Sequence, residues 1–266
     1  MTAKQNASKS AKTIKLKNNT QGTITGTVKG LKKGDSVWLY DTKAKWSYQI
    51  AVAEKKTLKI KQKVSPGTYR IVVGGTNKAS KAVTVRNKKT AKAGSLTAPS
   101  KRTKVSGTIK GSNGKAISNA SVAVYDKYGT LAGFTQTSAK GKYSVSGVVN
   151  GKYSLSLRDS SGNNAPTDAK LTVKKNKNAK KNVKLRKGYR VTGTVKYKSK
   201  TVAGVDISSG SSFTTTNSKG KFTLKGLGKG KHRLSANDPF TGGYLSRAKN
   251  VTVKSKNLKW NVSLKK

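Results

Sequence analysis

The chain lacks cysteine and is poor in histidine and acidic residues. It contains no Cys, one His and 8 Asp plus Glu in 266 residues. Without thiolates, neither disulfide bonds nor cysteine metal sites can form. The acidic residues are scattered along the chain, so the sequence shows neither a carboxylate pair for glycoside hydrolysis nor a calcium loop. We therefore expect a protein that is not an enzyme and that binds no metal or other cofactor.

Long hydrophobic runs are also missing. A membrane-spanning helix needs about 18 or more apolar residues in a row, and no segment approaches this length. Residues 1–12 are basic and have no hydrophobic stretch behind them, so they do not resemble an uncleaved signal peptide. We predict that they form a disordered basic tail. Either an export signal has been removed, or the protein is not exported by that route.

Positive charge is what the chain has in excess. Lys plus Arg number 58, for a formal net charge of +50. Because self-repulsion disfavours compaction, this charge favours an anionic partner, with a solubility device or adaptation to an unusual medium as the alternative. Lysine is a flexible point charge, which predicts diffuse binding. The lysines that we assign to polyanion binding are Lys43, Lys45, Lys88, Lys89, Lys174, Lys175, Lys177, Lys180 and Lys181.

One strand-like phrase occurs three times along the chain. It reads Thr23–Val28, Val105–Ile109 and Val191–Val195, and each copy is centred on a glycine. The spacing is 81 residues from Gly26 to Gly107 and 86 from Gly107 to Gly193. A period of this size indicates three similar small domains. The predicted division is a tail at 1–12, a divergent module 1 at 13–87, a polar linker at 88–102, module 2 at 103–185 and module 3 at 186–266.

The apolar residues within each module alternate with a period of two. Val183-Lys-Leu185 and Val251-Thr-Val253 are examples, and turn pairs such as Asn113-Gly114 separate such runs. This pattern is typical of β-strands with one buried face. The predicted fold is all-β, with three tandem small β-sandwich domains of the immunoglobulin-like or prealbumin-like kind. Because the junction of modules 2 and 3 is very short, we expect those two modules to be held at a more fixed angle than modules 1 and 2.

Modules 2 and 3 resemble a known family. The resemblance rests on the runs Val105–Tyr125 and Thr137–Tyr153 in module 2, and on Thr216–Phe222 and Gly226–His232 in module 3. These runs are similar to the carboxypeptidase regulatory-like domain, a transthyretin-type β-sandwich related to the B-type repeats of Gram-positive adhesins. The resemblance implies a non-catalytic domain that spaces, stiffens or binds, usually outside the cytoplasm or on a virion. Such repeats often carry a Lys–Asn/Asp crosslink promoted by an acidic residue; Glu54 is the only glutamate, so we expect none in modules 2 and 3.

Aromatic residues provide the other candidate site. Trp38, Tyr40, Trp46 and Tyr48 cluster beside Lys43 and Lys45 in what we predict to be a hairpin around residues 41–43. They are either core residues or an exposed platform on which sugar rings or bases stack. His232 occupies the position of Tyr69 and Tyr153 in the other modules, and we expect it to be a core substitution rather than a catalyst.

Three functions remain open after these observations. The first is a secreted or cell-surface structural or adhesive protein, held by charge to teichoic acid or an acidic polysaccharide. The second is a sequence-nonspecific nucleic-acid-binding protein. The third is a virion or filament subunit that self-assembles through its sheet edges.

Overall fold

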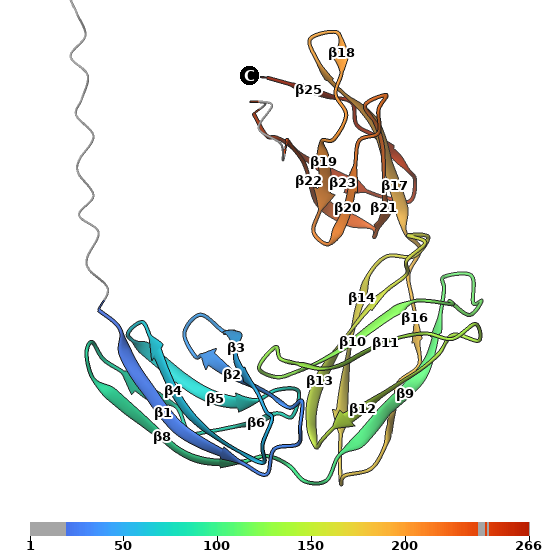
Figure 1. Ribbon diagram of the computed structural model, residues 1–266. Coiled ribbons are helices and arrows are strands. Elements are labelled where there is room, and N and C mark those ends of the chain that lie inside the picture. Colours follow the sequence, from blue (N-terminus) through green and yellow to red (C-terminus); the bar gives the residue numbers. More distant parts are fainter. Residues whose placement is uncertain (1–19, 239–242, 244, 266) are drawn as a thin grey trace, which may run out of the picture.

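The computed structural model describes residues 20–238, 243 and 245–265, and within them it consists of strands without any helix. The predicted basic tail and residues 13–19 of module 1 lie outside the described residues. Figure 1 shows three sandwiches that follow one another along a curved path. Three separate clusters of buried apolar side chains form their cores. The predicted all-β fold of three tandem sandwiches is therefore confirmed.

Module 1 begins the described chain. Its strands are β1 (Gly22–Lys29), β2 (Ser36–Asp41), β3 (Trp46–Val52), β4 (Thr57–Val64), β5 (Gly67–Val73), β6 (Lys78–Ala79), β7 (Val83–Val85) and β8 (Thr90–Thr97). One sheet has the order β4-β1-β8, and the other has the order β3-β2-β5-β6 with β7 also paired to β5. The core between the sheets includes Ile24, Leu39 and Ile71.

Module 2 repeats this plan. Its strands are β9 (Thr103–Lys110), β10 (Ser121–Asp126), β11 (Leu131–Gln136), β12 (Lys142–Val148), β13 (Gly151–Arg158), β14 (Thr167–Val173), β15 (Ala179–Lys180) and β16 (Val183–Lys184). The sheets have the orders β12-β9-β15, with β16 also on β9, and β11-β10-β13-β14. Tyr143 is buried in its core, as the predicted strand register requires.

Module 3 has the same two layers and one additional short strand. Its strands are β17 (Tyr189–Tyr197), β18 (Lys200–Thr201), β19 (Asp206–Ser209), β20 (Ser212–Thr215), β21 (Lys221–Leu227), β22 (Gly230–Asn237), β23 (Arg247–Val253), β24 (Leu258–Lys259) and β25 (Val262–Leu264). The sheets have the orders β18-β17-β21, with β24 and β25 also on β17, and β20-β19-β22-β23. Phe222 and Trp260 meet edge-on in the core, with ring centroids 6.3 Å apart.

The repeated glycine lies where the first strand of each module passes the last one. The two run parallel in every module; the pairing shifts register beside Gly26, and the last strand is interrupted opposite Gly107 and Gly193. A β carbon on Gly107 would collide with the carbonyl oxygen of Lys181, and one on Gly193 with that of Trp260. Close approach of two backbones therefore explains why the phrase is centred on glycine.

The prediction of a polar linker at 88–102 is wrong. Residues 90–97 form β8, which pairs in parallel with β1 and completes the core of module 1 with Leu96. The segment looks like a linker because most of its side chains face solvent and Leu96 alone is buried. The true connection to β9 is residues 98–102, and within it Ala98 is buried as well.

Candidate functional site

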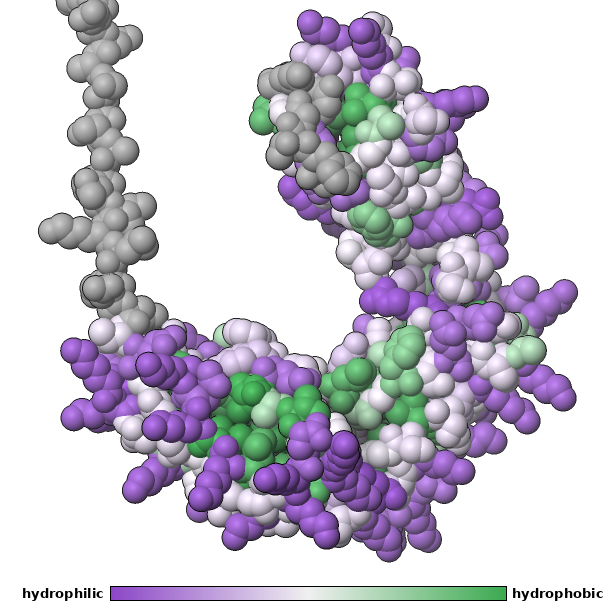
Figure 2. Space-filling view, in the orientation of Figure 1, coloured by the Kyte–Doolittle hydropathy of each residue, from purple (hydrophilic) through white to green (hydrophobic). Residues whose placement is uncertain are grey.

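Basic side chains cover all three modules, and one exposed basic turn recurs in each of them. Figure 2 shows hydrophilic side chains projecting from the whole length of the described chain. The strand that ends at a buried valine, Val85, Val173 or Val253, is followed in each module by an exposed basic turn. We call residues 86–89, 174–177 and 254–257 the basic turns. Their basic residues are Arg86, Lys88, Lys89, Lys174, Lys175, Lys177, Lys254 and Lys256.

The charge of these turns has little compensation within the protein. Two ion pairs lie in the described part of the chain, Lys33–Glu54 and Arg102–Asp35. Eight acidic residues cannot neutralise 58 basic ones in any arrangement. Of the lysines predicted to bind polyanions, Lys43 and Lys45 lie on the β2–β3 turn, five others belong to the basic turns, and Lys180 and Lys181 lie in and directly after β15. All are exposed except Lys181, which is half-buried.

The four clustered aromatic residues do not form one surface. They do lie on the predicted hairpin, since β2 pairs with β3 and Asp41 pairs with Trp46. The core-facing residues of β2 are Val37 and Leu39, so Trp38 and Tyr40 lie on its outer face. Tyr48 pairs with Leu39 and packs against the core, and its pKa is raised by burial and by the nearby Tyr69 and Asp41.

The outer face of this hairpin contacts module 2. The ring of Tyr40 lies edge-on to that of Tyr128, with centroids 5.1 Å apart, and the Ser47 hydroxyl donates to the Tyr128 carbonyl at 2.8 Å. Trp46 is 53% exposed and contacts Tyr48. A stacking platform that contains all four rings is therefore not present.

The tip of the β10–β11 hairpin fills the junction between modules 1 and 2. Asp126 is 5% exposed and accepts backbone N–H bonds from Tyr128 and Thr130 of its own turn and from Asn77 of module 1. The Thr130 hydroxyl accepts a bond from the Gly75 N–H at 2.7 Å. A buried carboxylate is stable only when it is hydrogen-bonded in this way. The sequence did not single out Asp126 as more than a turn residue.

Further contacts secure the same junction. Arg102 makes a two-pronged pair with Asp35, at 2.9 and 2.6 Å, and both side chains are largely buried. The Tyr153 hydroxyl accepts the Val149 N–H and donates to the carbonyl of Gly75 in module 1. Direct hydrogen bonds therefore join modules 1 and 2. The expectation that they are the more loosely joined pair depended on a long linker, and the real connection, residues 98–102, is short.

The equivalent hairpin of module 3 is shorter. Ala120 and Val205 are equivalent, because each donates its N–H to a threonine hydroxyl, of Thr137 and Thr216 respectively. Phe134 and Phe213 are also equivalent, since they pair with Ala123 and Ser208 at matching places. Between these markers module 2 has residues 121–133 and module 3 only 206–212. The β19–β20 hairpin therefore stops short of module 2.

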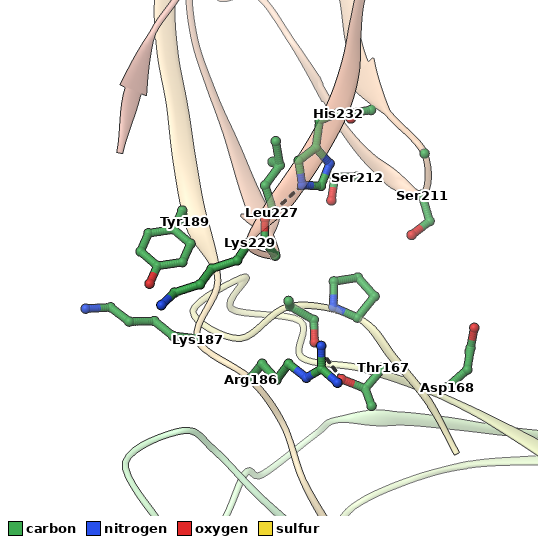
Figure 3. A pocket seen from close by; sticks show the side chains of 16 residues that line it. Thr167, Asp168, Arg186, Lys187, Tyr189, Ser211, Ser212, Leu227, Lys229 and His232 are labelled. Atoms are coloured by element: carbon green, nitrogen blue, oxygen red, sulfur yellow. Dashed lines mark hydrogen bonds between the residues drawn. The ribbon is translucent and has the colours of Figure 1, made fainter. Parts of the chain in front are cut away.

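A pocket of about 700 Å³ lies in the space that the shorter hairpin leaves between modules 2 and 3. Module 3 lines it with the hairpin tip 209–212, residues 226–229 and His232, and module 2 lines it with residues 165–168. The connector 186–189 closes one side. Figure 3 shows His232, Ser211 and Ser212 on one side of the gap, and Arg186, Thr167 and Asp168 on the other.

The side chains of this pocket combine positive charge with hydroxyl groups. Arg186, Lys187 and Lys229 are exposed cations, against one carboxylate, Asp168. The Lys187 ammonium lies 5.8 Å from the centroid of the Tyr189 ring. Hydroxyls are available from Ser209, which is 8% exposed, and from Thr167, Ser211 and Ser212. This set can bind an anion and hydrogen-bond a polar skeleton attached to it.

The loop that carries the module 2 side of the pocket is internally fixed. Asp159 accepts bonds from the Ser161 hydroxyl and the Asn164 amide, both at 2.7 Å. Burial by itself raises the pKa of Asp159, but these hydrogen bonds outweigh it and lower the pKa below its ordinary value. The loop is joined to the connector by bonds from the Ala165 N–H to Arg186 and from the Gly188 N–H to Asn163.

His232 lies at the expected position but is not a fully buried core residue. It is half-buried and its Nε2 lies 2.8 Å from the Gly228 carbonyl oxygen, four residues back. Tyr69 and Tyr153 also bond to the residue four positions back: the Tyr69 hydroxyl donates to the Ser65 carbonyl, and the Tyr153 hydroxyl accepts the Val149 N–H. The prediction of the position was sound, and that of burial was wrong, because the pocket exposes one side of this strand.

No further chemistry was found in the described part of the chain. Residues 20–238, 243 and 245–265 contain no cluster of His, Asp and Glu that could hold a metal ion. They also contain no helix long and apolar enough to cross a membrane. Glu54 lies at the surface, 3.7 Å from Lys33.

No curated protein matches the chain. The Bacillus anthracis TIE protein aligns with 16% identity and a TM-score of 0.31 over 92% of this chain and 51% of that one, so the chain spans about half its length. A Streptococcal ancillary pilin aligns with 10% identity and a TM-score of 0.33, over 92% and 99%. GBS52, the minor pilin of Streptococcus agalactiae, aligns with 14% identity and a TM-score of 0.34, over 62% and 96%.

One family model covers a single module. Residues 104–186 match the carboxypeptidase regulatory-like domain. These residues coincide with the strands β9 to β16 and their core. Module 2 therefore has the family resemblance that its sequence predicted.

Proposed function

We propose that the protein is a non-enzymatic structural or adhesive protein outside the cytoplasm, which binds polyanions through its lysines. The observation that carries the proposal is the recurrence of an exposed basic turn at the same place in all three modules. A charge excess that served solubility alone has no reason to recur at one turn. The secured junction between modules 1 and 2 presents two of these turns on a single body.

The aromatic residues do not decide between the classes of polyanion. Non-specific single-strand binding combines positive charge with exposed rings on which bases stack. Tyr40 is engaged with Tyr128 and Tyr48 packs on the core, but Trp46, Phe134 and Phe213 are exposed. The match of module 2 to the carboxypeptidase regulatory-like domain supports a wall polymer such as a teichoic acid, or an acidic polysaccharide.

Binding to different polyanions at two salt concentrations tests the proposal. With roughly 6–10 phosphates contacted, affinity should fall on the order of 10³-fold between 50 and 200 mM salt. Polyphosphate, an acidic polysaccharide and duplex DNA should all bind, with weak selectivity. An affinity that barely changes with salt, or strong preference for one DNA sequence, would contradict the proposal.

Retention on intact source cells tests the location. If charge alone holds the protein at the surface, a wash with about 1 M salt should release it, because the Debye length is then only about 3 Å. Release should be detectable by immunoblot of the wash. Protein found in the cytosol on chromosomal DNA, or in a particle that resists salt, would point to the other two functions.

A further inference from the structure

The pocket between modules 2 and 3 has a feature that diffuse charge does not explain. Most basic residues of this protein lie on convex turns and strand faces that are open to water. Arg186, Lys187 and Lys229 instead surround a concave space with hydroxyl groups in its walls. A concave site with convergent polar groups is the usual form of a small-ligand site.

The same place in the preceding junction shows what such a space can hold. There the β10–β11 tip inserts the Asp126 carboxylate and the Thr130 hydroxyl, which bond to backbone groups of module 1. At the second junction the tip is short, and among the described residues it makes no such bonds to module 2, whose loop is held by its own Asp159. The space that the tip leaves is lined by Arg186, Lys187 and Lys229 and by hydroxyl groups, so an anion with hydroxyls on its skeleton would fit it.

We propose that this pocket binds one anionic polyol unit, a phosphate group carried on a short hydroxylated carbon chain. Arg186 and Lys229 would contact the phosphate, since charge-assisted bonds to phosphate are the strong ones. Ser209, Ser211 and Thr167 would hydrogen-bond the hydroxyls. The inference rests on the proposed function and deepens it, because it gives polyanion binding one discrete site for a repeating unit of the polymer.

Titration of the full chain with small ligands tests this proposal. The probes are glycerol phosphate, inorganic phosphate and glycerol, followed by nuclear magnetic resonance at about 0.15 M salt, where exposed charges are screened beyond about 8 Å. Glycerol phosphate should bind saturably, with shifts at residues 209–212 and 226–229. Inorganic phosphate should bind more weakly, and glycerol should not bind.

Variants with matched controls locate the binding. Ser211→Trp blocks the pocket without any change in charge, and Ser218→Trp is the control on an exposed turn. Arg186→Ser with Lys229→Ser removes two charges from the pocket, and Lys59→Ser with Lys61→Ser removes two from the exposed face of β4. Both pocket variants should weaken glycerol phosphate binding by at least about tenfold, the effect of losing one charge-assisted bond. Both controls should bind as the unaltered chain does.

The outcomes separate this inference from the proposed function. If long polyanions bind with steep salt dependence while glycerol phosphate does not bind, or binds equally to pocket variants and controls, the pocket proposal is wrong and the proposed function stands. If inorganic phosphate binds as tightly as glycerol phosphate, the pocket recognises a free anion only, and the polyol proposal is wrong. If no polyanion binds, both fail. Should Ser211→Trp not fold, the serine variants decide.

Discussion

The two junctions of this protein are built from equivalent hairpins, but only the first hairpin is hydrogen-bonded to the preceding module. At the first, a long β10–β11 hairpin reaches module 1 and buries Asp126 against its backbone. At the second, the shorter β19–β20 hairpin leaves a pocket of about 700 Å³. The longer hairpin is hydrogen-bonded to the preceding module, and the shorter one leaves a pocket that we propose to be a binding site. Repetition of a domain provides both without a new fold.

Removal of Arg102 should have the largest effect on the first junction. Arg102→Ala leaves the largely buried Asp35 carboxylate without its cation, and breaking a buried pair in this way costs about 3 kcal/mol or more. Lys33→Ala is the matched control, because its pair with Glu54 is exposed and such pairs contribute about 0–1 kcal/mol. Denaturant unfolding of both variants measures the difference. Equal costs would mean that the junction does not depend on this pair.

A side chain on Gly75 should separate modules 1 and 2. The residue has φ of +68°, and a β carbon would collide with the backbone of Leu131 and Ala132. Gly75→Ala should cost about 1–2 kcal/mol for the left-handed conformation and about 1–3 kcal/mol more for overpacking. Gly210→Ala, at the tip of the short hairpin, has φ of +56° and open space around it, so only the first cost applies. Calorimetry should show a larger loss of unfolding free energy for Gly75→Ala than for Gly210→Ala.

Loss of the Tyr153 hydroxyl should have a smaller effect. Tyr153→Phe removes the bonds to Val149 and to Gly75 and leaves a buried N–H unsatisfied, at a cost of about 1–3 kcal/mol. His232→Phe removes only the contact with Gly228 at a half-buried site and should cost less. Small-angle scattering should show a looser arrangement of modules 1 and 2 only for Tyr153→Phe. If the scattering profile changed equally in both variants, the Tyr153 hydroxyl would not be specific to the junction of modules 1 and 2.

The smallest expected effect is the part of the alkaline pH dependence that comes from Tyr143 of module 2. Burial raises the pKa of Tyr143 from 10.0 to about 12. Because the folded pKa is the higher one, its stabilising contribution is complete below pH 10 and is lost as pH rises through about 12. Module 3 has Phe222 in this place and lacks the effect. Lysines also lose charge in this range, so the Tyr143→Phe variant is the reference. As the pH rises through about 12, the free energy of unfolding of Tyr143→Phe should fall less than that of the unaltered chain.

The sequence predicted the fold because alternation and repetition are local signals. Strict alternation with polar neighbours puts Tyr143, Phe222 and Trp260 on the inner faces of their strands, and the structure buries all three. The prediction failed at β8, whose exposed polar residues resemble a linker. Its buried Leu96 lies opposite Val28, as Val183 and Val262 lie opposite Ile109 and Val195 in the later modules. Alignment of these apolar residues would have identified the strand.

The site was only partly predictable for a related reason. Lys88, Lys89 and Lys174 were identified, but Arg86, Lys254 and Lys256 were missed, although each basic turn follows the same Thr-Val phrase. The pocket could not be predicted, because it arises from the relative length of two hairpins in separate modules. Burial of Asp126 depends on a contact with Asn77 of the preceding module, and no local pattern records such a contact.

The most direct test of polyanion binding is the salt dependence of affinity for polyphosphate in two variants of equal charge. The first replaces the eight basic residues of the basic turns by Gln. The second replaces eight exposed strand lysines, namely Lys59, Lys61, Lys63, Lys92, Lys142, Lys152, Lys221 and Lys249. Each lost phosphate contact should lower the slope of log affinity against log salt by about one. The account predicts a steep slope for the unaltered chain and a larger reduction in the first variant than in the second. A slope near zero for the unaltered chain, or equal slopes for the two variants, would contradict it.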